Sequence, residues 1–510
     1  MRKKTYALVL IAILALSAFI YFYRLDKESL LTDEYLSLYI SQKSPYDIIH
    51  KSDGAFNPNT IPPLYELILH GWLKLFGVSV FIQRSLSALF GIISVYLLYL
   101  LATLIFDRET GLLSALLGSF SFIWFLLFRQ DRCYSLLILL TLLSFYIFFS
   151  LIKIKYSRRN LFYLAATNIL LLYTHYISFF VIALEVVVAF IQWRKDYKKI
   201  AGMALACIAA ALAYLPWRAN LYYDILREPL MQRSFFALGA ARTCFTLFKI
   251  PLFHFHIHWN PLLAIIYAPF IIKGALKIKK DSPRLFLYLI LIFIVPSFFI
   301  CSFWSTERLR YYAPFLFPFL IMPAYGMRHL NIGGRVRKLV PVSLMTFIIT
   351  VNALDFADFF NTNINEEWKQ ASGIVRQISG SRNKKNIFIF QSRYNPPVFS
   401  YYFWGPETAE YLARSIASGQ YSRPDLSALG LKDKIYVVED MQGGSLLDQL
   451  NFISDGSLIW IFGYHSRFLA RNIKDAVKGA FTLQEIALNS EQPQIDVFLL
   501  KSSRWNNLSW

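Results

Sequence analysis

The feature that most constrains this chain is a series of long apolar stretches separated by short basic segments. The first apolar stretch covers residues 5–23, and several later ones are also about 17–25 residues long, enough for a helix to cross a bilayer. Hydrophobic residues make up 56% of the 510 positions, which is unusual for a soluble domain. Because only helices and closed barrels satisfy their backbone polar groups in lipid, we expect a polytopic α-helical membrane protein.

The pattern predicts about eleven membrane helices, since each apolar stretch approaches the length of a span. They are expected near residues 5–23, 82–106, 111–128, 134–154, 161–175, 177–193, 200–217, 261–275, 285–303, 312–327 and 339–356. The positive-inside rule places the N-terminal Met1-Arg-Lys-Lys in the cytoplasm, and the later basic segments then fall on the same side. The net charge of +20 therefore indicates topology and attraction to anionic lipid rather than binding of nucleic acid.

This topology divides the chain into a membrane domain, residues 1–356, with a first outer loop at 24–81, and an extracytoplasmic domain at 357–510. The second domain contains four short runs rich in apolar, β-branched and aromatic residues: Asn386–Phe390, Lys434–Val438, Leu458–Phe462 and Ile495–Leu500. Their spacing leaves room for helices and predicts an α/β domain with a small, partly parallel sheet. No glycine-rich phosphate loop follows these strands, which argues against nucleotide binding there. The four cysteines lie in or near the spans and indicate no disulfide framework.

Asp33 and Glu34 stand about ten residues beyond the first span, a placement that puts them on the outer face beside the membrane. Ionisable groups at a membrane are costly to keep and are commonly functional. The pair is therefore a candidate for acid–base chemistry at the membrane surface. The alternative interpretation is a solvated loop that contains two acids by chance.

Two arginine pairs are expected on the same face. Arg129 and Arg132 are one helical turn apart with Asp131 between them, and Arg308 and Arg310 precede the tenth apolar stretch. Arginine is permanently charged and can bind a phosphate through two parallel hydrogen bonds. Arginines at helix ends can also be simple anchors in the lipid headgroup region. Together with the acid pair, they favour a phosphate leaving group opposite a carboxylate base.

The order of five motifs along the chain resembles that of GT-C glycosyltransferases of the protein O-mannosyltransferase and lipid A aminoarabinose transferase type. The motifs are Leu31-Thr-Asp-Glu-Tyr, the segment from Pro62 to Gly77 that runs on through Arg84–Gly91, Arg129-Gln-Asp-Arg-Cys-Tyr-Ser-Leu, Tyr173-Thr-His-Tyr and Arg310-Tyr-Tyr-Ala-Pro. The resemblance covers roughly residues 30–330. It implies inverting transfer of a sugar from a polyprenyl-phosphate donor to an extracytoplasmic acceptor, which could be a protein, lipid A or a glycan. A bacterial inner membrane is the expected location.

Residue by residue, the resemblance implies that Asp33 is the general base, with Glu34 beside it. The implied contacts to the donor phosphate are Arg132 and Arg310, with Arg129 and Arg308 as further candidates, and the implied cavity-lining residues are Asp131, His175, Tyr176 and Tyr65. The chain departs from the family pattern at two positions. Ile61 stands where many relatives have a histidine or lysine, and Gln130 stands where many have a glutamate, a role that the adjacent Asp131 could take over.

We expect no cofactor, because a donor with a single phosphate leaves less charge to neutralise than a diphosphate does. A divalent metal at His254, His256 and His258 is the alternative, since alternate positions on a strand would present three imidazoles on one side. The plainer interpretation of these histidines is an aromatic-rich interfacial loop. Glu185, inside the sixth span, is expected either to bond a neighbouring helix or to face a functional cavity.

Two other classes of protein remain as alternatives. A transporter or flippase of lipid-linked sugars would carry charges through the membrane midplane and broken helices in matching halves. The chain has mainly Glu185 at that depth and no matching halves. A non-catalytic membrane scaffold would leave Asp33, Arg132 and Arg310 apart in space. The sequence leaves the sugar, the acceptor and the role of the C-terminal domain open.

Overall fold

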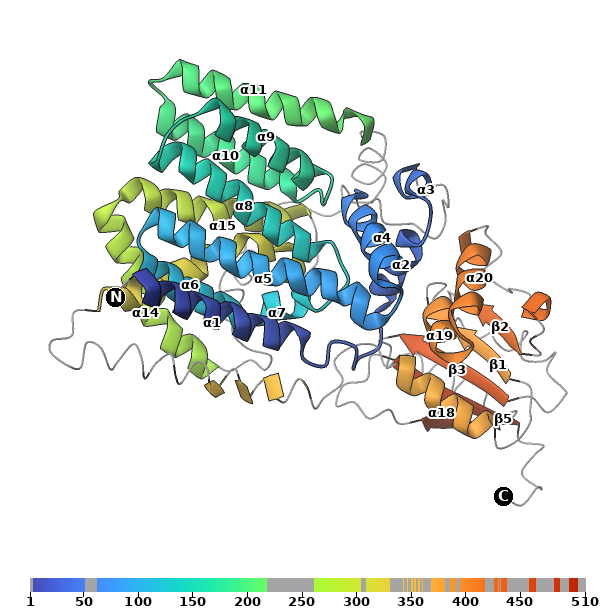
Figure 1. Ribbon diagram of the computed structural model, residues 1–510. Helices are drawn as coiled ribbons and strands as arrows, with labels where there is room; N and C mark the ends of the chain where they lie inside the picture. Colours follow the sequence, from blue (N-terminus) through green and yellow to red (C-terminus); the bar gives the residue numbers. More distant parts are fainter. Residues whose placement is uncertain are drawn as a thin grey trace. The chain divides into compact units, whose positions relative to one another are not determined.

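The computed structural model forms two compact units (Figure 1), one of Met1–Leu25 with Asn59–Asp358 and one of Asp26–Pro58 with Phe359–Trp510. The structure describes residues 3–50, 62–217, 261–303, 309–330, single positions between 343 and 360, 368–380, 386–390, 395–417, 426–429, 431, 433–437, 458–464, 481–486 and 495–502.

The first unit is helical. Its helices are α1 (Lys3–Phe22), α4 (Leu64–Phe76), α5 (Val80–Ile105), α6 (Arg108–Ser119), α7 (Phe122–Phe128), α8 (Tyr134–Lys153), α9 (Arg158–Leu172), α10 (Ser178–Trp193), α11 (Tyr197–Tyr214), α14 (Pro261–Asp281), α15 (Pro283–Phe303) and α16 (Pro318–Arg328). The long helix α5 packs against α1, α6 and α8 (Figure 1). The backbones of α14 and α16 approach so closely that a Cβ atom at Gly274 or Gly326 would collide with the facing carbonyl. Small residues allow such close contact between helices that have no hydrophobic drive to associate in lipid.

Five helical segments in the described part of the chain are long and apolar enough to cross a membrane. They are Lys4–Phe22, Val80–Ile105, Tyr134–Lys153, Tyr197–Trp217 and Pro283–Ile300. The bent pair α6 and α7 would make a sixth, and α10 is a shorter apolar helix. Each of these segments coincides with a predicted span, whereas the full count of about eleven stays a prediction.

Two of the predicted spans are interrupted. The stretch 111–128 is bent by 63° between α6 and α7, where the Ser121 side chain accepts a hydrogen bond from the Trp124 N–H and so begins a new helix. The stretch 312–327 becomes α-helical only at Pro318, after short 3₁₀ turns at Leu309–Tyr311 and Ala313–Phe315. Pro314 and Pro318 stand in the first turn of the second 3₁₀ helix and of α16, where the N–H that proline lacks would have no intrahelical partner.

The second unit contains a five-stranded sheet with the order β2-β1-β3-β5-β4. Its strands are β1 (Asn386–Phe390), β2 (Lys434–Val437), β3 (Leu458–Tyr464), β4 (Phe481–Ile486) and β5 (Ile495–Ser502), with helices α18 (Trp368–Gly380), α19 (Asn395–Phe403) and α20 (Pro406–Ala417). Strand β1 pairs in parallel with β2 and β3, and β5 pairs antiparallel with β3 and β4. The four predicted apolar runs are strands. The sequence analysis missed β4, whose residues Phe-Thr-Leu-Gln-Glu-Ile alternate between apolar and polar only over the first four positions.

The second unit also contains most of the first outer loop. Helices α2 (Thr32–Ser41) and α3 (Pro45–His50) belong to it, whereas α4 belongs to the first unit. The sequence-based division assigned all of 24–81 to the membrane domain, and the structure divides this loop at about Pro58. Hydrogen bonds within the second unit connect this part of the loop to residues far along the chain, such as the 2.7 Å bond from the Leu30 N–H to the Tyr402 hydroxyl.

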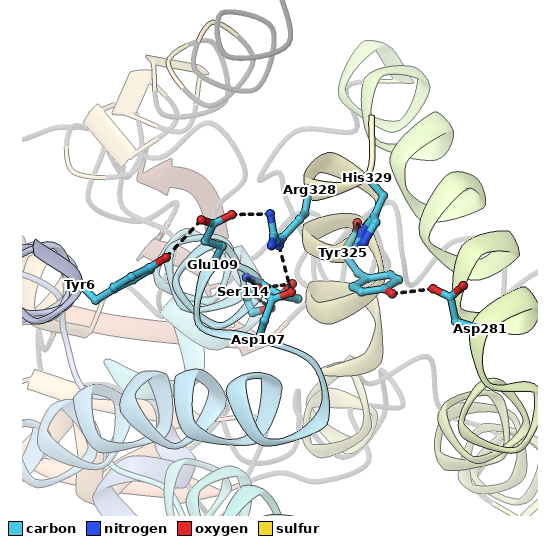
Figure 2. Close-up of polar contacts among 9 residues, drawn as sticks. Tyr6, Asp107, Glu109, Ser114, Asp281, Tyr325, Arg328 and His329 are labelled. Atoms are coloured by element: carbon cyan, nitrogen blue, oxygen red, sulfur yellow. Dashed lines mark hydrogen bonds and ion pairs between the residues drawn. The ribbon is translucent and has the colours of Figure 1, made fainter. Parts of the chain in front are cut away.

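A polar cluster joins several segments of the first unit (Figure 2). The Arg328 guanidinium pairs with Asp107, at 2.9 Å from Nε to Oδ2, and with Glu109, which also accepts a 3.1 Å hydrogen bond from the Tyr6 hydroxyl. Beside it, the Tyr325 hydroxyl donates to Asp281 at 2.7 Å. The contributing segments are α1, the start of α6, α14 and α16, and the sequence predicts all these ends on one side of the membrane. Their meeting in one cluster agrees with that prediction.

The Arg328→Met substitution should lower the free energy of unfolding by about 1 kcal/mol, since it breaks two partly exposed ion pairs that join distant segments. The matched control is Lys199→Met, which breaks a local pair with Asp196 of similar exposure in the same unit. Thermal unfolding in detergent micelles measures both, and the difference should shrink in 1 M salt. An Arg328 variant that melts no earlier than the Lys199 variant would show that the cluster does not hold these helices together.

Candidate functional site

The acid pair lies in the first turn of α2. Glu34 is fully buried, and its Oε2 accepts a 2.9 Å hydrogen bond from the backbone N–H of Leu31, the residue that precedes the helix. This bond satisfies one of the amides that a helix start leaves without an intrahelical partner. Asp33 is only partly buried. Asp33 is therefore the better placed of the two to meet a substrate, while Glu34 stabilises the start of the helix. The catalytic roles of both stay predictions.

Arg129 follows α7 and binds the end of α1. Its Nη1 donates to the carbonyl oxygens of Tyr21 at 3.0 Å and Tyr23 at 2.8 Å, and its Nη2 donates to that of Arg24 at 3.1 Å. The last carbonyls of a helix lack intrahelical partners and favour a positive charge. Arg129 thus connects two segments irrespective of any ligand, and its role as a phosphate contact stays a prediction.

Asp131 belongs to a buried polar network at the start of α8. The Tyr65 hydroxyl, from α4, donates to Asp131 Oδ1 at 2.6 Å and lies 2.8 Å from the hydroxyl of Ser87 on α5. The Ser135 hydroxyl donates to Ser87 at 2.9 Å. Burial, followed by the nearby Asp131 carboxylate, raises the pKa of Tyr65, so its hydroxyl keeps the proton that it donates. The network fixes α4, α5 and α8 against the turn that contains Arg132.

His175 lies in the turn between α9 and α10. Arg132 and Arg310 both lie near it. Arg132 and His175 are buried, and Arg310 is partly buried. The His175 Nδ1 accepts a 3.2 Å hydrogen bond from the Ile177 N–H, so the neutral ring has its proton on Nε2. The charges of Arg310 and Arg132 act on this ring. The site therefore combines two permanent cations with an imidazole whose Nδ1 is an acceptor and carries no proton.

Aromatic rings surround these groups. The guanidinium carbon of Arg310 lies 5.4 Å from the centre of the Tyr134 ring and 5.7 Å from that of Tyr311. The His175 ring lies 5.4 Å from the Tyr134 ring, 5.8 Å from the Tyr311 ring and 6.3 Å from the Tyr176 ring. Cation–π contacts of this kind hold a guanidinium in place without neutralising its charge. The sequence analysis did not single out Tyr134 or Tyr311, although each stands within two residues of a proposed phosphate-binding arginine.

Glu185 has the structural partners that one interpretation of the sequence expected. The Ser144 hydroxyl donates to its Oε1 at 2.5 Å, and the Asn168 amide donates to its Oε2 at 2.8 Å. These bonds join α8, α9 and α10 inside the bundle. Other predicted residues, namely Ile61, Arg308, His254, His256 and His258, lie outside the described residues. Within the described part of the chain, no group of three histidine, cysteine or acidic side chains could hold a metal ion.

Comparison with known proteins connects these features to a known architecture. The model of the dolichyl-phosphate-mannose-protein mannosyltransferase family matches residues 60–217. ArnT from Cupriavidus metallidurans bound to undecaprenyl phosphate is similar in structure, with a TM-score of 0.53 and 13% identity over 96% of this chain and 97% of that one. Archaeal oligosaccharyltransferase AglB from Archaeoglobus fulgidus, in complex with an inhibitory peptide and a dolichol-phosphate, gives a TM-score of 0.56 and 11% identity over 99% of this chain and 75% of that one.

The chain has the GT-C glycosyltransferase fold. The resemblance seen in the sequence motifs is thereby confirmed, and the region matched by the family model contains Tyr65, Arg132 and His175. With its apolar helices, this GT-C chain is an integral multi-pass membrane protein. No curated protein matches it in sequence.

Proposed function

We propose that this chain is an inverting glycosyltransferase that moves a sugar from a polyprenyl-phosphate donor to an acceptor hydroxyl outside the cytoplasm. The observation that carries the proposal is the pair of guanidinium groups, Arg132 and Arg310, beside the neutral His175. The fold supports it, since similar structures hold undecaprenyl phosphate and dolichol-phosphate. The arginines of this chain have the chemistry to bind the same class of lipid phosphate.

The arginines act on the leaving group. A polyprenyl-phosphate sugar is a phosphodiester with one negative charge. When the bond between the sugar C1 and the phosphate oxygen breaks, the electron pair stays on that oxygen and the phosphate gains a second negative charge. Arg132 and Arg310 stabilise this charge as it develops, and the Nε2–H of His175 is available as a further donor. The rings of Tyr134 and Tyr311 lie against the Arg310 guanidinium and hold it in place.

Asp33 acts on the acceptor. Its carboxylate removes the proton of the acceptor hydroxyl as the oxygen forms its bond to C1. Attack on the side opposite the leaving phosphate inverts the configuration at C1. The reaction needs no oxidant, reductant or covalent intermediate. Because the two arginine charges match those of the released phosphate, it also proceeds without a metal in this proposal.

The Asp33→Asn substitution should reduce transfer by about a hundredfold to ten-thousandfold, since it removes the base while keeping the size of the side chain. The measurement is transfer from a panel of radiolabelled polyprenyl-phosphate sugars to crude cell-envelope acceptor, with purified protein in nanodiscs. The matched control is Asp47→Asn, which changes a partly buried acid of the same loop that accepts a hydrogen bond from the Ser44 hydroxyl and should leave transfer intact. Unchanged transfer by Asp33→Asn would overturn the assignment. Labelled lipid that crosses the bilayer without any transfer would favour a flippase.

The substitutions Arg132→Gln and Arg310→Gln should each weaken the binding of undecaprenyl phosphate by about 10- to 100-fold, because each removes a charge-assisted hydrogen bond to the phosphate. Binding is measured on protein in nanodiscs by titration with the lipid. Arg159→Gln is the control, since Arg159 is exposed at the start of α9, away from the site. Equal affinities in all three variants would show that the phosphate binds elsewhere.

A further inference from the structure

The second unit fixes the chain just before α2 through hydrogen bonds. The Leu30 N–H donates to the Tyr402 hydroxyl at 2.7 Å, and the Lys369 N–H donates to the Ser29 hydroxyl at 3.0 Å. The Lys27 ammonium donates to the carbonyl oxygen of Phe360. Three bonds within four residues thus attach the start of this loop to segments more than 300 positions later in the chain.

Side-chain packing continues these bonds along α2. Leu30 is fully buried, and Tyr35, in the first turn of the helix, is 4% exposed. The Tyr35 ring lies 6.1 Å from that of Tyr401 in an edge-on arrangement. Tyr401 and Tyr402 are neighbours on α19. This helix therefore contacts both the residue Leu30, which precedes α2, and Tyr35 in the first turn of α2.

These contacts lead us to propose that Tyr402 is a positioning residue for transfer, which fixes the direction of Asp33 through the backbone of Leu30. This inference rests on the function proposed above and gives the C-terminal unit a role besides any recognition of the acceptor. Leu30 stands immediately before Leu31, the capping residue of α2, and Asp33 is two residues after Leu31. The Tyr402 bond therefore sets the path by which the chain enters the helix.

The expected consequence is a loss of rate rather than of binding. A displacement of a reacting group by about 1 Å can cost a hundredfold in rate while substrates still bind. A C-terminal unit that served only to recognise the acceptor would behave differently, because damage to it would raise the KM for the acceptor. The division between kcat and KM separates these two roles.

The test uses the full chain with Tyr402→Phe, which keeps the ring and removes the oxygen that accepts from Leu30. Transfer should show kcat reduced about tenfold, with KM for donor and acceptor within about twofold of the wild type. Ser29→Ala should act in the same direction. The matched control is Tyr401→Phe, which keeps the ring contact with Tyr35 and should leave kcat unchanged. A normal kcat in Tyr402→Phe, or a change confined to the KM for acceptor, would overturn the proposal.

Hydrogen exchange gives a readout that does not depend on transfer. The amides of residues 30–36 should exchange faster in Tyr402→Phe than in the wild type or Tyr401→Phe, since the removed bond holds the Leu30 amide itself. Unchanged exchange would overturn the positioning role even if the enzyme is active. Faster exchange in a protein that shows no transfer with any donor would instead support the contact and reject the proposed function, so the two failures are distinguishable.

Discussion

The structure depends on keeping two guanidinium charges beside a histidine in a largely buried site. A buried charge is costly unless it has partners that balance it. Around Arg132 and Arg310, the neutral state of His175 avoids a third positive charge, and aromatic rings face Arg310 without neutralising it. Two permanently charged guanidinium groups close to one ring make this region suited to an anion.

In the first unit, the helix breaks lie next to the segments that contain Arg132 and Arg310. The bend between α6 and α7 precedes the turn that contains Arg132. Two 3₁₀ turns precede α16, and the first of them contains Arg310 and Tyr311. Non-helical backbone near the membrane is tolerated where protein covers it or where it lines a functional site. Two contacts stabilise the turn that contains Arg132. Arg129 donates a hydrogen bond to a carbonyl oxygen at the end of α1, and Asp131 accepts a hydrogen bond from the Tyr65 hydroxyl.

The sequence predicted those helices and strands whose signal lies in a short local pattern of residues. Apolar length located α1, α5 and α8, and apolar runs located four of the five strands, because both signals are read within about twenty residues. The arginines and His175 were selected as candidates through motifs, and their roles stay predictions. Their surroundings were not found, because Tyr134 and Tyr311 reach the site only through the packing of α8 against the turns before α16.

Long-range hydrogen bonds connect the first outer loop to the second unit, and the sequence did not predict them. Nothing within the loop itself indicates that Leu30 bonds Tyr402 or that Ser29 bonds Lys369, so the loop was assigned to the membrane domain as a whole. Glu34 shows the same limit on a smaller scale. Its charge suggested catalysis, whereas its bond to the Leu31 N–H shows that it also stabilises the start of α2. The type of a residue shows which chemistry its side chain can perform. Its hydrogen-bond partners show whether the side chain also has a structural role.

The most direct test of the account is an experimental structure of the protein in nanodiscs with undecaprenyl phosphate bound. The account predicts a phosphate within hydrogen-bonding distance of both Arg132 and Arg310, with the Asp33 carboxylate on the side from which an acceptor would approach. A phosphate bound elsewhere would contradict the central claim. So would an Asp33 carboxylate more than about 15 Å from the phosphate, because groups that far apart cannot share one substrate at hydrogen-bonding range.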